Sequence, residues 1–192
     1  MFEGLSNIIM INITQFDSTN IENMDCMFCG CSSLKSIFFN NFNESSVTDM
    51  SNMFSECTSL NKLILDIFNT SSVTDMNNMF YLCNSLVFLD LDNLNTSSVT
   101  NMDSMFNDCE KLESLFLNSF NTSIVDDMNS MFSGCSSLLS LNILNFNTSS
   151  VGNMAAMFSG CSSLESLIFD FDTNLVGYMA SMFSDCNKLI LL

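Results

Sequence analysis

The sequence predicts an α/β repeat fold, a solenoid with a parallel β-sheet on its concave face and short helices on the other side. Three observations predict it. The dipeptide Met-Phe recurs at an almost constant interval of 26 residues, each copy lies in an apolar stripe with helical spacing, and each is followed by a short alternating run. One unit of this length cannot bury its apolar face alone, so neighbouring units must stack.

Fixed columns of apolar residues run through all 192 residues. The Met-Phe pairs begin at Met1, Met27, Met53, Met79, Met105, Met131, Met157 and Met182. Three residues after each Phe stand Leu5, Cys31, Cys57, Cys83, Cys109, Cys135, Cys161 and Cys186. No linker interrupts the columns, so we expect residues 1–192 to form a single solenoid of about seven to eight repeats.

The two ends of the sequence fall inside repeats. Met1 already belongs to a Met-Phe pair, and Leu192 falls within a predicted strand. Solenoids need polar caps at both ends to stay soluble. The sequence therefore indicates a fragment that lacks end caps, or a chain that pairs end to end.

The first half of each unit has the pattern of a short helix. In residues 46–57, apolar side chains at Val47, Met50, Phe54 and Cys57 are three or four residues apart, which places them on one helical face. A Ser stands three residues before Asp49, an arrangement that resembles a capping box with Asp in place of Glu or Gln. We expect a helix of roughly two to three turns here.

The second half of each unit has the pattern of a strand. Leu60-x-x-Leu63-x-Leu65-x-x-Phe68 contains two alternating Leu, as in a half-buried strand, and Leu-x-x-Leu-x-Leu is the strand signature of leucine-rich repeats. The following Asn-Thr-Ser, which begins at Asn69, turns the chain into the next unit. The predicted fold is therefore a leucine-rich-repeat solenoid.

Together these motifs resemble a known family. Met-x-x-Met-Phe-x-x-Cys-x-x-Leu-x-x-Leu, with Phe-Asn-Thr-Ser-x-Val between copies, is similar to the 26-residue bacterial surface-protein repeat, which is allied to the BspA-like leucine-rich repeats. The resemblance covers nearly the whole chain. It implies a surface or secreted protein of bacteria or protists that is used for adhesion or protein binding, and it brings no catalytic residues or cofactor.

The charge balance excludes several classes of function. Asp and Glu number 21 against 4 Lys and Arg, which gives a net charge of −17, and there is no His. Nucleic acids and anionic membrane surfaces are recognised by basic side chains, so neither is an expected partner. Without His, the commonest acid–base catalyst is missing, and we expect no enzyme. The sequence also shows no signal peptide and no apolar run long enough for membrane insertion.

The cysteines have a structural and a chemical interpretation. Those that follow the Met-Phe pairs lie on the apolar stripe, where Leu5 takes the same place, so we expect small buried thiols rather than a metal or disulfide array. Cys26 and Cys29 lie outside this column and form Cys26-x-x-Cys29-x-Cys31. This spacing can bind zinc, but no second ligand pair follows, so we predict no metal site.

The Asn residues between units allow three interpretations. Six of them start an Asn-x-Ser/Thr glycosylation motif: Asn12, Asn43, Asn69, Asn95, Asn121 and Asn147. We favour a role in building the turn, with the glycosylation motif as a by-product. Calcium is conceivable because Asp17 and Asp172 occupy the same column, but the Gly-rich spacing of calcium-binding β-rolls is absent.

The strand positions that alternate with the core vary from unit to unit, and they supply the candidate binding residues. We expect an exposed apolar patch beside acidic side chains, formed by Phe38, Ile64, Asp66, Phe88, Asp90, Asp92, Phe116 and Ile168. Such a patch would bind a protein, and a host surface or matrix protein is the expected class. Strand propensity alone also explains Phe and Ile at these positions. In that case the solenoid is a spacer or stalk that projects another domain and has no ligand of its own.

Overall fold

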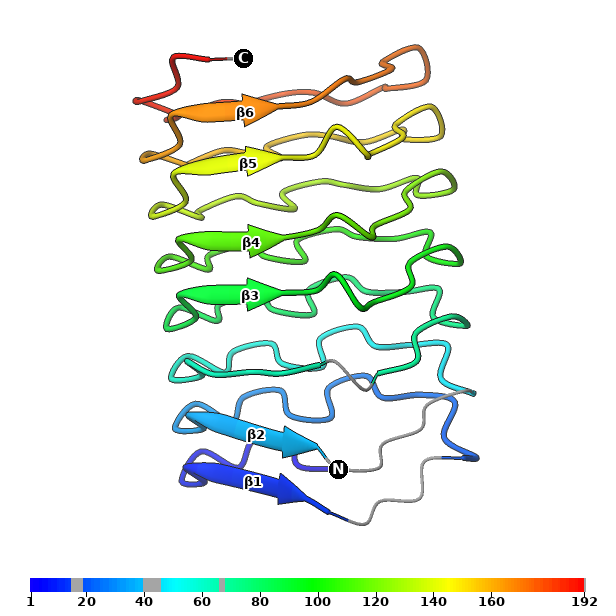
Figure 1. The fold of residues 1–192 in the computed structure, drawn as a ribbon, viewed down its shortest axis with the longest axis vertical. Helices are drawn as coiled ribbons and strands as arrows, with labels where there is room; N and C mark the ends of the chain where they lie inside the picture. The colour runs from blue at the N-terminus through cyan, green and yellow to red at the C-terminus, as the bar shows by residue number, and fades with distance from the viewer. Residues whose placement is uncertain (15–18, 40–45, 66–67, 192) are drawn as a thin grey trace.

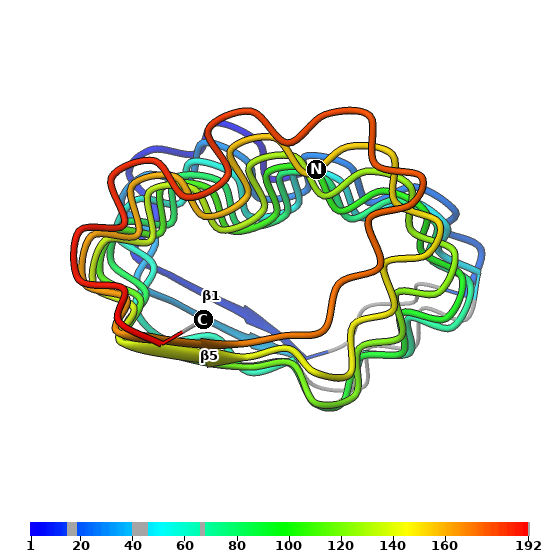
Figure 2. The same ribbon diagram turned by 90° about the horizontal axis from the view of Figure 1, so that it is seen from above.

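The structure is a computed structural model, and it describes residues 1–14, 19–39, 46–65 and 68–191. The chain winds into coils that stack along one axis (Figure 1), and each coil follows nearly the same outline when seen along that axis (Figure 2). The strands lie on one side of the outline. They are β1 (Met10–Ile13), β2 (Ser36–Phe39), β3 (Phe88–Asp90), β4 (Ser114–Phe116), β5 (Ser140–Asn142) and β6 (Ser166–Ile168). The predicted repeat solenoid is confirmed.

The strands pair in parallel, one repeat apart. In the described part of the chain they form three two-stranded sheets, β1–β2, β3–β4 and β5–β6. Single bridges extend the first sheet to Lys62 and the last to Leu191. Two seams therefore divide this side of the solenoid, one between the Lys62 coil and β3 and one between β4 and β5.

The predicted helices are wrong, because the described residues contain no helix at all, and so none that could span a membrane. Two positions in each repeat adopt positive φ, which a right-handed helix does not allow. The first lies between the two Met of the motif, with φ of 52–60° at Cys26, Asn52, Asn78, Ser104, Ser130, Ala156 and Ser181. The second precedes the Cys column and is occupied by Gly4, Gly30, Glu56, Leu82, Asp108, Gly134, Gly160 and Asp185.

The backbone hydrogen bonds show what replaces the helix. The N–H of Met53 donates to the carbonyl of Met50 at 3.3 Å and closes a turn within the coil. The next N–H, that of Phe54, donates instead to the carbonyl of Met79 in the following coil at 3.0 Å. In a helix both would bond four residues back in the same segment. Consecutive turns with alternating local and inter-coil bonds therefore satisfy the backbone on this side.

The predicted capping box at Ser46 and Asp49 is also wrong. The Oδ1 of Asp49 accepts the N–H of Ser51 at 2.9 Å, while the hydroxyl of Ser46 donates to the carbonyl of Thr19 in the preceding coil at 3.0 Å. Asp49 thus forms an Asx turn, which competes with helix initiation. The same bond, to the N–H two residues ahead, is made by Asn23, Asp75, Asn101, Asp127 and Asn153.

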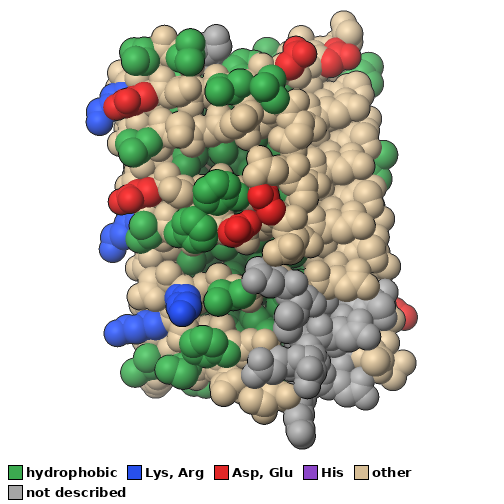
Figure 3. Space-filling model, in the orientation of Figure 1, with side chains coloured by type: hydrophobic (Ala, Val, Ile, Leu, Met, Phe, Trp, Pro, Cys, Tyr) green, Lys and Arg blue, Asp and Glu red, His purple; other side chains and the backbone are tan. Residues whose placement is uncertain are grey.

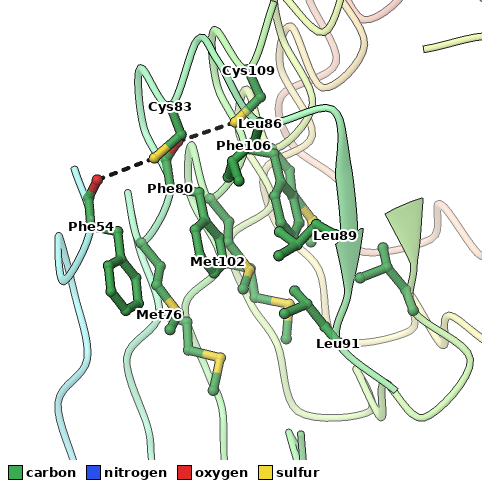
Figure 4. Packing of buried hydrophobic residues seen from close by; sticks show 14 of the residues in the cluster. Phe54, Met76, Phe80, Cys83, Leu86, Leu89, Leu91, Met102, Phe106 and Cys109 are labelled. Atoms are coloured by element: carbon green, nitrogen blue, oxygen red, sulfur yellow. Dashed lines mark hydrogen bonds between the residues drawn. The ribbon is translucent and has the colours of Figure 1, made fainter. Parts of the chain in front are cut away.

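The core lies between the turns and the strands and consists of stacked identical residues. The Phe of each Met-Phe pair stacks on its equivalents, with ring centroids 5.3–5.7 Å apart and rings within 8° of parallel from Phe2 to Phe183. Figure 4 shows three of these rings side by side, with Met76 and Met102 beside them. Met79 and the other central members of these columns have no exposed surface. The predicted apolar columns are confirmed as the core.

The Cys column is part of this core, as predicted. The Sγ of Cys83 donates to the carbonyl of Phe54 at 3.2 Å, and that of Cys109 donates to the carbonyl of Phe80 at 3.2 Å (Figure 4). The same bond recurs at Cys31, Cys57, Cys135, Cys161 and Cys186. Burial raises the pKa of these thiols, to about 12 at Cys161. They therefore remain protonated donors that tie each coil to the one before it.

The Asn-Thr-Ser segments form a second polar ladder. Thr96 is fully buried, and its hydroxyl donates to the carbonyl of Asn121 at 2.9 Å and accepts the N–H of the same residue at 2.8 Å. Thr70 makes the same two bonds to Asn95. These two Thr thus each satisfy two backbone groups of the next coil, which would otherwise be buried without a partner.

Candidate binding surface on the sheet face

The outward side chains of the strands form one surface, which we call the sheet face (Figure 3). Along each strand they alternate with buried residues such as Leu89 and Leu141. The exposed members are Met10, Asn12, Phe38, Lys62, Ile64, Phe88, Asp90, Ser114, Phe116, Ser140, Asn142 and Ile168. Every described residue among the predicted binding residues is therefore exposed, except Asp92, which is half-buried. Asp66 lies outside the described residues.

Two aromatic side chains meet at the centre of the sheet face. Phe88 opens β3 and pairs with Ser114, while Asp90 ends β3 and pairs with Phe116 of β4. This register places the two Phe on a diagonal, within reach of each other. Their ring centroids are 5.6 Å apart and tilted by 52°, and 55% of Phe88 and 42% of Phe116 remain exposed. Both rings thus present apolar surface that no other part of the described chain covers.

Two carboxylates border this aromatic pair. Asp90 is exposed, and its Oδ1 accepts the N–H of Asp92 at 3.0 Å. Asp92 accepts the backbone N–H of Asn118 at 2.6 Å and the side-chain amide of Asn118 at 2.7 Å. Asp92 therefore holds the chain after β3 against the chain after β4. Asp90 keeps more of its hydrogen-bonding capacity for a ligand.

The remaining predicted residues lie in separate groups. Phe38 belongs to β2, and Ile64 lies two residues after Lys62, which a single bridge joins to β2. The Nζ of Lys62 lies 5.9 Å from the centroid of the Phe38 ring. This arrangement is a cation–π contact, which leaves the ring less available than that of Phe88. Ile168 belongs to β6, opposite Asn142. The structure thus brings together Phe88, Asp90, Asp92 and Phe116, but not the whole predicted set.

The seam between β4 and β5 forms a groove that the sequence did not indicate. No backbone hydrogen bond joins these two strands in the part of the chain that the structure describes. The groove has a volume of about 310 Å³. It is lined by Glu113, Ser114, Leu115, Phe116, Leu117, Asn118, Ser140 and Asn142. Leu115 is only half-buried here, whereas the equivalent Leu of β3 and β5 are buried. The groove therefore widens the sheet face beside Phe116 and adds hydroxyl and amide groups to it.

The three clustered cysteines do not assemble a metal site. No group of three or more His, Cys, Asp or Glu side chains suited to a metal ion occurs among the described residues. The Sγ of Cys31 is buried and donates to the carbonyl of Phe2 at 3.0 Å, whereas Cys26 and Cys29 are partly exposed. Of the three thiols, only those of Cys26 and Cys29 are therefore accessible to solvent.

The Asn of the described Asn-Thr-Ser segments build turns, as the sequence analysis favoured, whereas Asn12 lies in β1. The Oδ1 of Asn95 accepts the N–H of Ser97 at 3.0 Å, and Asn69, Asn121 and Asn147 make the same bond. Asp172 accepts the N–H of Asn174 at 2.9 Å in the same way. Asn43 and Asp17 lie outside the described residues. In the described Asn-Thr-Ser segments, the hydrogen bond within the turn therefore explains the position of the Asn side-chain oxygen without a calcium ion.

Comparison with known proteins places these features in a family. A family model described as "Mycoplasma protein of unknown function, DUF285" matches residues 1–114 and 83–190, nearly the whole chain. No curated protein sequence matches the chain.

A solved structure shows the same fold. The chain is 22% identical to the leucine rich repeat protein of T. pallidum, with a TM-score of 0.61 over 95% of this chain and 78% of that one. A leucine rich cell surface protein from Faecalibacterium prausnitzii is 18% identical, with a TM-score of 0.43 over 99% and 60% of the two chains. An internalin from Listeria monocytogenes is 18% identical, with a TM-score of 0.46 over 98% and 48%. The first of these likenesses shows that the fold is that of leucine-rich-repeat proteins.

Proposed function

The chain belongs to the DUF285 family, so its repeats are of the BspA-like leucine-rich type, and we propose that it is a protein-binding module that uses the sheet face. The proposal rests on one observation. Phe88 and Phe116 contact each other at the centre of the strands and still expose about half of each ring. Exposed aromatic pairs beside polar groups are typical of binding surfaces, because burying them on association is favourable.

The surroundings of the pair favour a basic protein partner. Asp90 lies next to both rings, and the net charge of the whole chain is −17. Complementary charge mainly speeds association, while buried aromatic side chains supply most of the affinity. The groove beside Phe116 offers hydroxyl and amide groups for hydrogen bonds at the edge of the contact. We place the module at a cell surface, where a host surface or matrix protein is the partner class.

A structural spacer is the second candidate, and the regularity of the core supports it. The stacked Phe rings, the Cys ladder and the Thr ladder join every coil to the next in the same way, which suits a stalk that projects another domain. A spacer needs no exposed aromatic pair. The two candidates therefore differ in what they predict for Phe88 and Phe116.

The test is a binding assay with the double variant Phe88→Ser, Phe116→Ser. The probes are immobilised laminin and collagen, with association followed by biolayer interferometry. If the aromatic pair anchors a partner at about 2 kcal/mol or more for each ring and the two losses add, the double variant loses at least about 700-fold in affinity. Its unfolding midpoint should stay close to that of the wild type, because both side chains are exposed.

The matched control is Ile124→Ser, which removes a side chain of similar exposure that lies outside the strands. It should bind as the wild type does. Asp90→Asn should slow association and weaken its dependence on salt. Equal binding by the double Phe variant and the wild type would reject the sheet face as the binding surface and favour the spacer.

A further inference from the structure

One turn of the solenoid departs from the repeat at both of its ends. Cys26 occupies the column that holds Asn52, Asn78, Ser104, Ser130, Ala156 and Ser181 in the other coils. Cys29 occupies the column that holds Ser55, Tyr81, Asn107, Ser133, Ser159 and Ser184. Neither column needs a thiol to build the turn, so two thiols in the same turn call for a chemical explanation.

The turn brings these two side chains together. The N–H of Cys29 donates to the carbonyl of Cys26 at 3.2 Å, so the residues are the first and fourth of a β-turn. Such a turn keeps its end Cα atoms within about 7 Å, which overlaps the separation of 4.4–6.8 Å, roughly, that a disulfide requires. The two thiols also share a side-chain hydrogen bond. Burial, and then this hydrogen bond with Cys29, raises the pKa of Cys26 to about 12.

Exposure separates this pair from the other thiols apart from Cys186, which is partly exposed as well. Cys26 and Cys29 are partly exposed, whereas Cys31 and the ladder members from Cys57 to Cys161 are buried in the core. Each ladder thiol is also held by its bond to a Phe carbonyl. A soluble oxidant therefore reaches the pair and not the buried ladder thiols. The pair lies in the turn segment between β1 and β2, outside both strands.

We propose that Cys26 and Cys29 form a reversible disulfide within this turn, which makes it a redox modification site that exchanges with small-molecule disulfides. The thiolate of Cys29 attacks one sulfur of a disulfide RSSR, forms a mixed disulfide and releases RS⁻. The thiolate of Cys26 then attacks the Sγ of Cys29 and releases the second RS⁻. The two cysteines lose two protons and two electrons in total, and RSSR is reduced to two RSH.

The test treats the folded full chain with oxidised glutathione, blocks the remaining thiols and maps the cysteines by mass spectrometry. The expected product has lost two hydrogen atoms, contains a Cys26–Cys29 link and returns to the dithiol with a reductant. The buried ladder thiols should become alkylated only after unfolding. In the Cys26→Ser variant the second step cannot occur, so Cys29 should retain glutathione. Ser is the native residue of this column in other coils, so this variant is expected to fold.

A matched control introduces the pair into another coil. The variant Ser130→Cys, Ser133→Cys has the same turn, closed by an N–H to carbonyl bond of 3.0 Å, and should form the same link. Recovery of Cys26 and Cys29 as free thiols, or with a glutathione on each, would overturn the proposal. So would zinc that stays bound and protects both thiols from glutathione. Binding through the sheet face is measured separately, so the failure of one proposal leaves the other intact.

Discussion

Replacing Met79 by Asp tests the assignment of the core columns. Met79 lies in the middle of the solenoid and has no exposed surface. Its backbone joins two coils, because its carbonyl accepts the N–H of Phe54 at 3.0 Å. The substitution keeps this bond but places a carboxyl group among Phe and Met side chains that offer it no hydrogen-bond donor.

Two effects set the size of the loss in stability. Removing a buried side chain as large as Met costs about 2–5 kcal/mol. Burying a polar group without a hydrogen bond costs about 2–7 kcal/mol more. The sum, at least about 4 kcal/mol, is a large part of the 5–15 kcal/mol, roughly, that stabilises a typical domain. The free energy of unfolding of Met79→Asp should fall by that amount or the chain should not fold.

The loss should also depend on pH with a defined sign. Burial in the core raises the pKa of the introduced carboxyl above its unfolded value of about 3.9. The folded state therefore holds the proton more tightly than the unfolded state does. The penalty is smallest below about pH 4 and grows by about 1.4 kcal/mol per pH unit above it, up to the folded pKa.

Urea unfolding followed by circular dichroism measures both effects, with Met79→Leu as the control. Leu keeps the volume and adds no polar group, so it should cost less than about 1.5 kcal/mol. Equal midpoints for Met79→Asp and the wild type would refute the placement of this column in the core. Equal losses for Asp and Leu would refute the argument from the buried carboxyl.

Three further predictions concern the ladders and the turns. Burial, and next the neighbouring thiols, raise the pKa of Cys83, Cys109 and Cys135, so these thiols lose their protons at lower pH in the unfolded chain than in the folded one. The free energy of unfolding should therefore fall above about pH 9, by about 1.4 kcal/mol per pH unit for each thiol. Urea titrations at several pH values measure this fall. Thr96→Val removes a hydroxyl that makes two bonds to Asn121 and should cost about 1–3 kcal/mol; an unchanged urea midpoint would contradict the role given to the Thr ladder. Glu56→Gly relieves a φ of 59° at an exposed position and should raise the melting midpoint, with a gain of up to about 1 kcal/mol, whereas Glu56→Val should lower it.

The core could be predicted from the sequence because the repeat length is constant. When a chain returns to the same place every 26 residues, equivalent residues stack on each other, and only the buried ones are forced to stay alike. The Phe rings from Phe2 to Phe183 and the Cys column follow from this rule. What the rule does not give is the hydrogen bond from each Cys to a Phe carbonyl, which depends on the path of the backbone between the columns.

The helices were predicted wrongly because consecutive turns imitate helical spacing. Met50, Met53, Cys57 and Leu60 are three or four residues apart on a helix, but a chain that turns inward at each of these steps buries the same residues. The sequence does contain a distinguishing signal. In four repeats a Gly stands one residue before the Cys column, close to the end of the expected helix but still inside it, where Gly is less favourable than Ala: Gly4, Gly30, Gly134 and Gly160. Their positive φ explains the choice.

The candidate site was predictable in part. Alternation along the strands is enough to assign Phe88, Asp90 and Phe116 to the outward side. The contact between the two rings depends on the register of β3 against β4, which a repeat length of 26 residues already fixes. The groove between β4 and β5 has no counterpart in the sequence, because residues 112–117 match the pattern of the other repeats. It arises where two neighbouring strands fail to pair, which composition does not reveal.

Hydrogen–deuterium exchange tests the central claim, that the sheet face binds a protein, most directly. The exchange of backbone amides is compared in the free chain and in its complex with an immobilised matrix protein that it binds. Binding through the sheet face predicts slower exchange in residues 88–92 and 114–118 and unchanged exchange in the turns of residues 74–84 and 100–110. Protection confined to the turns, with no change in the strands, would contradict it.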